Sequence, residues 1–408
     1  MNPNNDTPSI RFAGFTDAWE QRKLCSMTSY QNGKGYEECQ SDSGKFALIN
    51  LNSISINGGL KESGKYVNEA TETLELNDLV MVLSDVGHGD LLGRVALIPE
   101  SNKFVLNQRV ALLRPLEESN PQFLFTCINA SQSYFKKNGA GSSQLNISKG
   151  VVENFSPSIP RDRNEQDKIG ILFRNFDTLI TLHQRKYDQL VNIKKSMLEK
   201  MFPKNGELVP EVRFAGFTDA WEQRKVSEIA TFSKGTGYSK SDIRDKGTPL
   251  ILYGRLYTKY ETVIREVDTF AIPKDGSVYS RGGEVIIPAS GETAEDISIA
   301  SVVEKSGVIL GGDLNIITPQ SGIDSAFLAL SISHGEAHRS LSKLAQGKSV
   351  VHIHNSDIQT VEVSIPELSE QESISQFFER VDTLITLHQR KLERLQNIKK
   401  ACLEKMFV

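Results

Sequence analysis

The strongest constraint on this chain is an internal duplication. The segment RFAGFTDAWEQRK occupies residues 11–23 and returns unchanged at residues 213–225. A second segment, DTLITLHQRK, stands at residues 177–186 and again at residues 382–391. The two offsets, 202 and 205 residues, are nearly equal, so a whole unit is duplicated and not a single motif. Since 408 residues are also too many for one ordinary core, the sequence predicts two similar domains in tandem.

Between these landmarks the two copies diverge strongly but keep a common skeleton. Residues 33–36 (GKGY) correspond to residues 235–238 (GTGY). An adjacent Glu-Gln pair occurs late in each copy, at Glu165-Gln166 and at Glu370-Gln371. One fold therefore appears twice with two different surfaces, which indicates two readers of two different targets.

The diverged inserts predict a mixed α/β (α+β) fold. Runs of β-branched residues bounded by Gly, Pro or Asn are typical of strands. VALLRP (110–115), GEVIIPAS (283–290) and SVVEKSGVIL (301–310) are runs of this kind. FLFTCINASQSYFKK (123–137) and AFLALSISHGEAHRSLSKL (326–344) are longer and favour helices.

Each copy then closes with a predicted long helix. Apolar residues recur at steps of three and four between Phe176 and Met201, and in the same phase between Val381 and Met406. One apolar stripe on a polar helix predicts packing on a partner helix, and the obvious partner is the other copy. Pro203 ends the first helix. The stripes include Leu179, Ile180, Leu190, Ile193, Leu384, Ile385, Leu395 and Ile398, together with His183 and His388, which we interpret as polar positions that specify register.

With this order of domain, helix, domain and helix, the whole chain resembles the specificity subunits of type I restriction–modification systems. The resemblance rests on the repeated FAGFTDAWEQRK and DTLITLHQRK segments and on LILYGRLYTKY at residues 250–260. It implies two target-recognition domains, separated and followed by helices that form an antiparallel coiled coil with pseudo-two-fold symmetry. In this family the coiled coil spaces the two domains and docks modification subunits, so the stripe residues would form the spacer and the partner interface.

The resemblance further implies a non-catalytic chain that reads a bipartite double-stranded DNA target. The chain would recruit two modification (methyltransferase) subunits for adenine methylation and, with ATP-dependent restriction subunits, would direct cleavage. S-adenosylmethionine, ATP and magnesium would belong to those partners, with no cofactor and no metal in this chain. The expected parts are a flexible tail (1–10), a first recognition domain (11–160), a central helix (161–205), a second recognition domain (206–366) and a C-terminal helix (367–408).

A DNA-reading surface holds few carboxylates, because each is repelled by the phosphates. Residues 119–152 contain no Asp or Glu, and the corresponding window 325–356 contains only Glu336. Each window includes a loop, at residues 139–146 and 346–354. Gln144 and Asn146 of the first loop fit adenine, and Lys348 of the second fits guanine or a phosphate. The predicted DNA contacts are Lys136, Lys137, Ser142, Ser143, Gln144, Asn146, Lys149 and Arg94 in the first copy, and Arg255, Arg339, Lys343, Lys348, Ser349 and His352 in the second.

Other interpretations stay open at this point. Both windows could be neutral surface over a core helix, and the chain could be a stand-alone DNA-binding regulator of a bipartite operator. An enzyme would need a site around four histidines, but H-x-E-x-H is not the metalloprotease order. We expect His352 and His354 to stand two residues apart on one strand, which points both side chains to the same face. The four are His334, His338, His352 and His354.

Two glycine patterns resemble nucleotide-binding motifs. Gly347-Lys348-Ser349 looks like the end of a phosphate-binding loop, but the earlier glycine of that motif is replaced by Ser342. The glycine pairs at residues 33–35 and 235–237 lack the rest of a dinucleotide fingerprint, and we interpret them as turns.

Composition adds the last constraints. The net charge of −4 means that DNA binding must depend on local surfaces and not on the overall charge. No apolar run is long enough to cross a membrane, and the N-terminus lacks the features of a secretory signal. The four cysteines are scattered, with no C-x-x-C pair. We therefore expect a cytoplasmic globular protein with reduced thiols.

Overall fold

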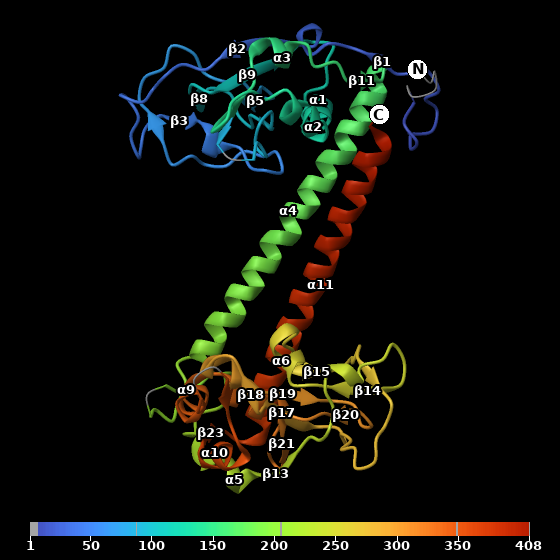
Figure 1. The fold of residues 1–408 in the computed structure, drawn as a ribbon. Helices are drawn as coiled ribbons and strands as arrows, with labels where there is room; N and C mark the ends of the chain where they lie inside the picture. The colour runs from blue at the N-terminus through green and yellow to red at the C-terminus, as the bar shows by residue number, and fades with distance from the viewer. Residues whose placement is uncertain (1–6, 87, 205, 348–349, 408) are drawn as a thin grey trace. The chain divides into compact units, whose positions relative to one another are not determined.

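The computed structural model describes residues 7–86, 88–204, 206–347 and 350–407. The chain divides into two compact units (Figure 1). The first unit joins Met1–His183 to Arg390–Val408, and the second unit is Gln184–Gln389. The units contain the same kinds of sheets in the same strand order, which confirms the predicted duplication of a mixed α/β fold.

The first unit is built around an antiparallel sheet that is buried on both faces. Because neighbouring side chains of a strand point to opposite faces, the apolar run of β5 fills two cores. Leu79 and Met81 join a cluster with the helices, and Val80 and Val82 join a cluster with a second, three-stranded sheet. The main sheet has the order β2 (Thr28–Asn32), β9 (Val110–Pro115), β5 (Leu79–Val82), β7 (Val95–Leu97), and the second has the order β4 (Tyr66–Val67), β3 (Phe46–Ile49), β8 (Phe104–Leu106).

The second unit repeats this plan. Val285 and Ile287 of its central strand face the helical side, and Ile286 faces the smaller sheet. The main sheet has the order β13 (Ala230–Lys234), β21 (Leu314–Pro319), β17 (Glu284–Pro288), β19 (Ser301–Val303), with β15 (Val263–Ile264) added at the edge. The smaller sheet has the order β16 (Phe270–Ala271), β14 (Thr248–Ile251), β20 (Ile309–Leu310).

Two further strand pairs occur in each unit. The entry segment pairs with the strand before the long helix, as β1 (Glu20–Gln21) with β11 (Ser158–Ile159) and β12 (Glu222–Lys225) with β23 (Glu362–Ile365). A short strand after the central strand pairs with a loop, as β6 (Ser84–Val86) with β10 (Gln144–Asn146) and β18 (Ser290–Gly291) with β22 (Val351–His352).

The two predicted insert helices are each broken in the structure. The first divides at Ser131 into α1 (Pro121–Ala130) and α2 (Gln132–Lys137). The second divides at His334 into α8 (Ser325–Ser333) and α9 (Gly335–Leu344), where Gly335 has a φ of +70°. Shorter helices are α3 (Lys149–Glu153), α5 (Val226–Ile229), α6 (Gly254–Thr258), α7 (Ala294–Ile297) and α10 (Asn355–Thr360).

Each entry segment is tied to its long helix by a buried ion pair. The Arg11 guanidinium donates to both oxygens of Glu165 at 2.6 and 2.8 Å, and Arg213 donates to Glu370 at 2.7 and 2.8 Å. Both carboxylates are fully buried. Hydrogen bonding to Glu165 raises the pKa of Arg11 above its usual range, and Glu370 does the same for Arg213. The repeated Arg and the repeated Glu-Gln pair of the sequence are thus two ends of one contact.

The long helices α4 (Arg163–Lys200) and α11 (Leu368–Met406) each begin in one unit and end in the other. In the first unit the Phe407 ring lies 5.9 Å from that of Phe123 and 5.8 Å from that of Phe173. In the second unit Phe202 lies 5.8 Å from Phe327 and 6.3 Å from Phe378. The core of each unit is therefore completed by the phenylalanine that follows a long helix whose first residues belong to the other unit.

Within each unit the two helices run antiparallel, as predicted. In the first unit the Asp177 carboxylate accepts a hydrogen bond from the Lys399 ammonium at 2.5 Å, and in the second unit Lys194 pairs with Asp382 at 2.5 Å. These are equivalent positions of the two copies. The same charge pair therefore links the two helices at equivalent positions in each unit.

The apolar stripe divides into a packed part and an exposed part. Ile180, Leu190, Ile385 and Leu395 are half-buried. The other four predicted stripe residues are 39–45% exposed, so their role in the spacer or the partner interface stays a prediction; they are Leu179, Ile193, Leu384 and Ile398. None of the helices that the structure describes is both long and apolar enough to cross a bilayer.

Candidate nucleic-acid interface

The two predicted DNA-contacting loops have the same backbone geometry. In the first unit Ala140 and Asn146 exchange two backbone hydrogen bonds of 2.9 Å. In the second unit Gln346 and His352 exchange two of 3.1 and 2.8 Å. Each loop turns through a glycine with large positive φ, +132° at Gly141 and +144° at Gly347, where an added Cβ would lie 1.9 Å from a carbonyl oxygen three residues later. The equivalence predicted for these loops therefore extends to single residues.

A serine that the sequence did not reveal supports each loop. In the first unit Ser84 of β6 donates its hydroxyl to Asn146 Oδ1 at 2.8 Å and also contacts the Gln144 amide. In the second unit Ser290 of β18 lies 3.1 Å from His352 Nδ1. The two serines lie about 60 residues from the loops in the chain, so only the strand pairing brings them together.

The acid-poor window of the first unit is less basic than its sequence indicates. The Lys136 ammonium pairs with the Asp90 carboxylate at 2.8 Å, and this hydrogen bond lowers the pKa of Asp90. Lys149 lies 3.5 Å from Glu153 and over the ring of Tyr30. Lys137, Ser142 and Ser143 are exposed. Asp90 comes from outside the window, so a sequence count of charges could not include it.

In the second unit the predicted contacts lie in α9 and in the loop after it. Arg339 pairs with Glu336 one turn earlier, and Lys343 is exposed near the end of the same helix. His352 is exposed at the end of β22. Lys348 and Ser349 lie outside the described residues.

Two of the three predicted arginine contacts, Arg94 and Arg255, are engaged within the protein. Arg94 donates to the backbone carbonyl of Asn129 at 3.0 Å, and burial lowers the pKa of its guanidinium. Arg255 pairs with Glu261 at 2.8 Å and with Asp268 at 2.6 Å, and its side chain is only 8% exposed. This placement favours a role of both arginines in loop structure. Their contact with DNA stays a prediction.

The four histidines do not converge on one site. His334 begins α9, and burial lowers its pKa to about 4. His338 Nδ1 lies 2.8 Å from the backbone oxygen of Ser298. The expectation that His352 and His354 alternate on one strand is wrong, because β22 ends at His352 and His354 begins α10. Over the described part of the chain, no group of three or more His, Cys, Asp or Glu residues is arranged to hold a metal ion.

The first glycine of each GxGY motif is not a turn, which corrects the sequence interpretation. The backbone N–H groups of Gly33 and Gly235 continue the ladders of β2 and β13 at 3.0 Å. A Cβ at either position would lie under 2 Å from a carbonyl oxygen of the facing segment, so only glycine fits.

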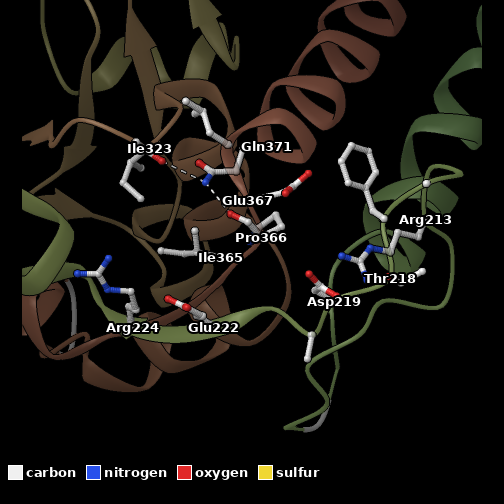
Figure 2. A pocket seen from close by; sticks show the side chains of 15 residues that line it. Arg213, Thr218, Asp219, Glu222, Arg224, Ile323, Ile365, Pro366, Glu367 and Gln371 are labelled. Carbon is white, nitrogen blue, oxygen red and sulfur yellow. Dashed lines mark hydrogen bonds between the residues drawn. The ribbon is translucent and has the colours of Figure 1, made fainter.

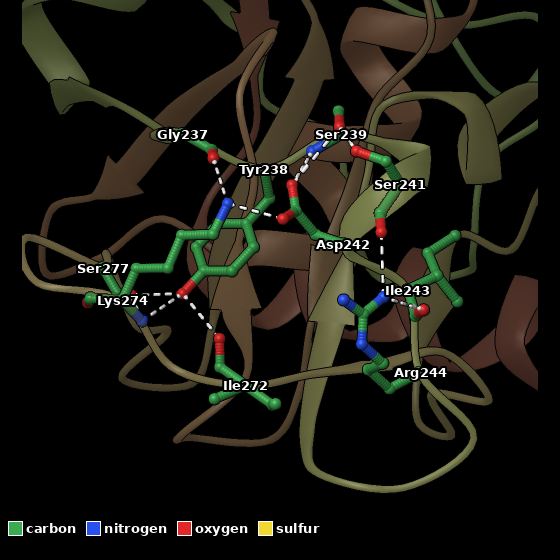
Figure 3. A network of polar contacts seen from close by, with 10 residues as sticks. All are labelled: Gly237, Tyr238, Ser239, Ser241, Asp242, Ile243, Arg244, Ile272, Lys274 and Ser277. Carbon is green, nitrogen blue, oxygen red and sulfur yellow. Dashed lines mark hydrogen bonds and ion pairs between the residues drawn. The ribbon is translucent and has the colours of Figure 1, made fainter.

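The tyrosine of the second motif holds a polar network that closes the loop after β13 (Figure 3). The Tyr238 hydroxyl accepts a hydrogen bond from the backbone N–H of Lys274 at 2.7 Å. The Lys274 ammonium lies over the Tyr238 ring and pairs with Asp242 at 2.6 Å. The motif therefore serves the fold and not a nucleotide.

A cavity of about 370 Å³ lies between the second entry segment and the start of α11 (Figure 2). Arg213, Thr218 and Asp219 line one side of it, and Pro366 and Gln371 line the other. The entry residues are identical in the first copy. Pro366 and Gln371 also recur there, as Pro160 and Gln166, so much of the lining belongs to the repeated part of the chain.

Comparisons with known proteins agree with this architecture. A family model described as the type I restriction modification DNA specificity domain matches the chain twice, at residues 16–192 and 218–397. The type I restriction enzyme MjaVIII specificity subunit of Methanocaldococcus jannaschii is 21% identical over 337 residues, which are 79% of this chain and 76% of that protein. The putative MjaX specificity subunit of the same organism is 21% identical over 360 residues, 84% of this chain and 80% of that protein. The crystal structure of a type I S subunit from M. genitalium has a TM-score of 0.66 at 14% identity, and the match covers 98% of this chain and 99% of that one.

Proposed function

Because the chain belongs to the family of type I restriction–modification DNA specificity proteins, we propose that it reads a bipartite DNA target, with one half-site bound by each unit. It is the DNA specificity subunit of such a system and is itself non-catalytic. The S-adenosylmethionine, ATP and magnesium of these systems belong to the modification and restriction subunits.

One observation carries the proposal of two half-sites. The loops at residues 140–146 and 346–352 have the same backbone hydrogen bonds and different exposed side chains, Asn146 in one and His352 in the other. A protein distinguishes base edges by the donors and acceptors that it places against them. Two loops with the same backbone frame, meaning the same backbone hydrogen bonds, and with different side chains therefore suit two different DNA sequences.

The partners that we propose are two modification subunits and, for cleavage, restriction subunits. Large apolar side chains that are exposed on the two long helices support this, since a partner that binds there would cover them. These side chains are Leu179, Ile193, Leu384 and Ile398, which are 39–45% exposed. We place the complex in the cytoplasm, where its DNA substrate lies.

The part boundaries and the DNA contacts named from the sequence are proposals too. The recognition domains would span residues 11–160 and 206–366, and the spacer helices residues 161–205 and 367–408. Asn146 and His352 are exposed and differ between the copies, and Gln144 lies in the same loop as Asn146, so we rank these three ahead of Arg94 and Arg255 as base contacts.

Methylation sequencing of the host genome with and without the gene tests the function. We expect adenine methylation at one bipartite motif. This methylation should be lost when the gene is deleted and should return when the gene is restored. A regulator of a bipartite operator would instead leave every methylated motif in place and change transcription near its binding sites, which would contradict our proposal.

A further inference from the structure

The loop residues Asn146 and His352 occupy the same position in two copies of one frame. The offset of 206 residues that relates them also relates Ser84 to Ser290 and Gly141 to Gly347. Asn146 and His352 each form backbone hydrogen bonds across their own loop. The next residue in the chain bonds the strand that carries the serine: the Ile147 N–H donates to the Leu83 carbonyl oxygen at 2.9 Å, and the Ile353 N–H donates to that of Ala289 at 3.1 Å. The backbone at this position is thus held on both sides.

The side chains at this position are exposed, and each is oriented by its serine. Asn146 Oδ1 accepts from the Ser84 hydroxyl at 2.8 Å, and Asn146 Nδ2 donates to the Gln144 carbonyl oxygen at 3.1 Å. One amide hydrogen and one lone pair of the carbonyl oxygen remain for a ligand. His352 Nδ1 is 3.1 Å from the Ser290 hydroxyl, so Nε2 remains for a ligand.

We propose that Asn146 and His352 are equivalent base-reading positions, and that Ser84 and Ser290 are positioning residues that fix the direction of each reading group. This inference rests on the proposed function and names where that function discriminates between bases. The remaining donor and acceptor of the Asn146 amide fit the N7 and N6 atoms of adenine. When the Ser290 hydroxyl donates to Nδ1, the neutral His352 ring carries its proton on Nε2 and fits an acceptor such as N7 or O6 of guanine.

Reciprocal substitution tests the equivalence. Asn146→His and His352→Asn are each expressed in the full chain with its modification subunits, and the methylation rate is measured on duplexes that vary one base pair at a time. We expect Asn146→His to change the preferred base at one position of the first half-site, and His352→Asn to do so in the second. Discrimination at that position should fall by roughly 5- to 150-fold, with the other half-site unaffected.

The test of Ser84 and Ser290 must measure base discrimination at single positions, which would not change selectively if the serines only stabilised the fold. Ser84→Ala should lower discrimination at the same single position as Asn146→His, and Ser84→Thr, which keeps the hydroxyl, should restore it. Ser133→Ala, on the exposed face of α2, is the matched control and should leave discrimination unchanged. Ser290 should behave in the same way toward the second half-site.

The outcomes separate this inference from the proposed function. Unchanged base preference in both Asn146→His and His352→Asn, or an equal change in both half-sites, overturns the inference while the function stands. Loss of dependence of the methylated motif on this chain overturns the function itself. Asn146→Asp and His352→Gln provide a second pair of variants if either first variant is poorly folded, and they carry the same expectation of a change confined to one half-site.

Discussion

The two units of this protein share the contacts that build their common frame, and they differ in side chains that this frame exposes. Both contain the buried Arg–Glu pair, the phenylalanine cluster at the helix end and the inter-helix Lys–Asp pair. They differ at the loop position held by Asn146 and His352, and in the residue that breaks the insert helix, Ser131 against His334. Residues that build the frame recur because each unit must fold in the same way, whereas residues that differ are free to meet different ligands.

The buried ion pair gives the largest expected effect and tests whether the frames are equal. Glu165→Ala and Glu370→Ala each leave an arginine without its carboxylate in a buried site, which should lower the free energy of unfolding of the affected unit by about 3–5 kcal/mol. Denaturant unfolding of the two variants measures this loss. Glu266→Ala is the control, because Glu266 pairs with Lys305 on the surface at 2.9 Å and its loss should change the free energy of unfolding far less. Clearly unequal losses in the two variants would show that the frames differ.

The phenylalanine clusters predict that one copy can replace the other. A half-chain of residues Met1–Gly206 contains the first entry segment and α4 but lacks Phe407, which completes the core of the first unit. In a dimer of two half-chains, Phe202 of one should fill the place of Phe407 in the other, since its partners Phe327 and Phe378 are the equivalents of Phe123 and Phe173. With modification subunits this dimer should methylate a palindrome made of the first half-site and its inverse.

Light scattering and methylation sequencing of the half-chain measure these outcomes. Phe202→Ala in the half-chain should abolish association, because truncating a buried Phe costs about 3–5 kcal/mol. A half-chain that remains monomeric, or that methylates an asymmetric motif, would contradict the pseudo-two-fold arrangement.

Much of the frame could be predicted from the sequence, because duplication and apolar periodicity are local signals. The strands at VALLRP and GEVIIPAS and the two long helices were found in this way. Contacts between distant segments could not be found. Ser84 meets Asn146 only through strand pairing, and Asp90 reaches Lys136 from 46 residues away. The need for glycine at Gly33 arises from the backbone of a facing segment, which no local motif records.

The helix stripe gives a smaller effect that separates folding from partner binding. Ile180 is half-buried, so Ile180→Asp with Ile385→Asp would place two carboxylates in the seam and should lower stability by about 1–3 kcal/mol per residue. Leu179 is 42% exposed, so Leu179→Asp should change stability by under about 0.5 kcal/mol and instead weaken binding of the modification subunits. Thermal unfolding and co-purification measure the two properties. A large loss of stability in Leu179→Asp would show that it packs in the seam.

The smallest effect is a pH dependence that only the second unit should show. Burial lowers the pKa of His334 from 6.5 to about 4, whereas the corresponding helix break in the first unit, Ser131, does not titrate. Between pH 6.5 and pH 4 the unfolded state binds a proton at this histidine that the folded state does not, so unfolding is favoured as the pH falls. The stability contributed by neutral His334 is complete above pH 6.5 and is lost progressively down to about pH 4. Between pH 6.5 and pH 5.5 the loss should be about 1 kcal/mol. Comparison of the full chain with His334→Ser at each pH isolates this contribution, since other titrating groups are common to both. Parallel pH profiles of the two proteins would show that His334 is protonated as easily in the folded state as in the unfolded one.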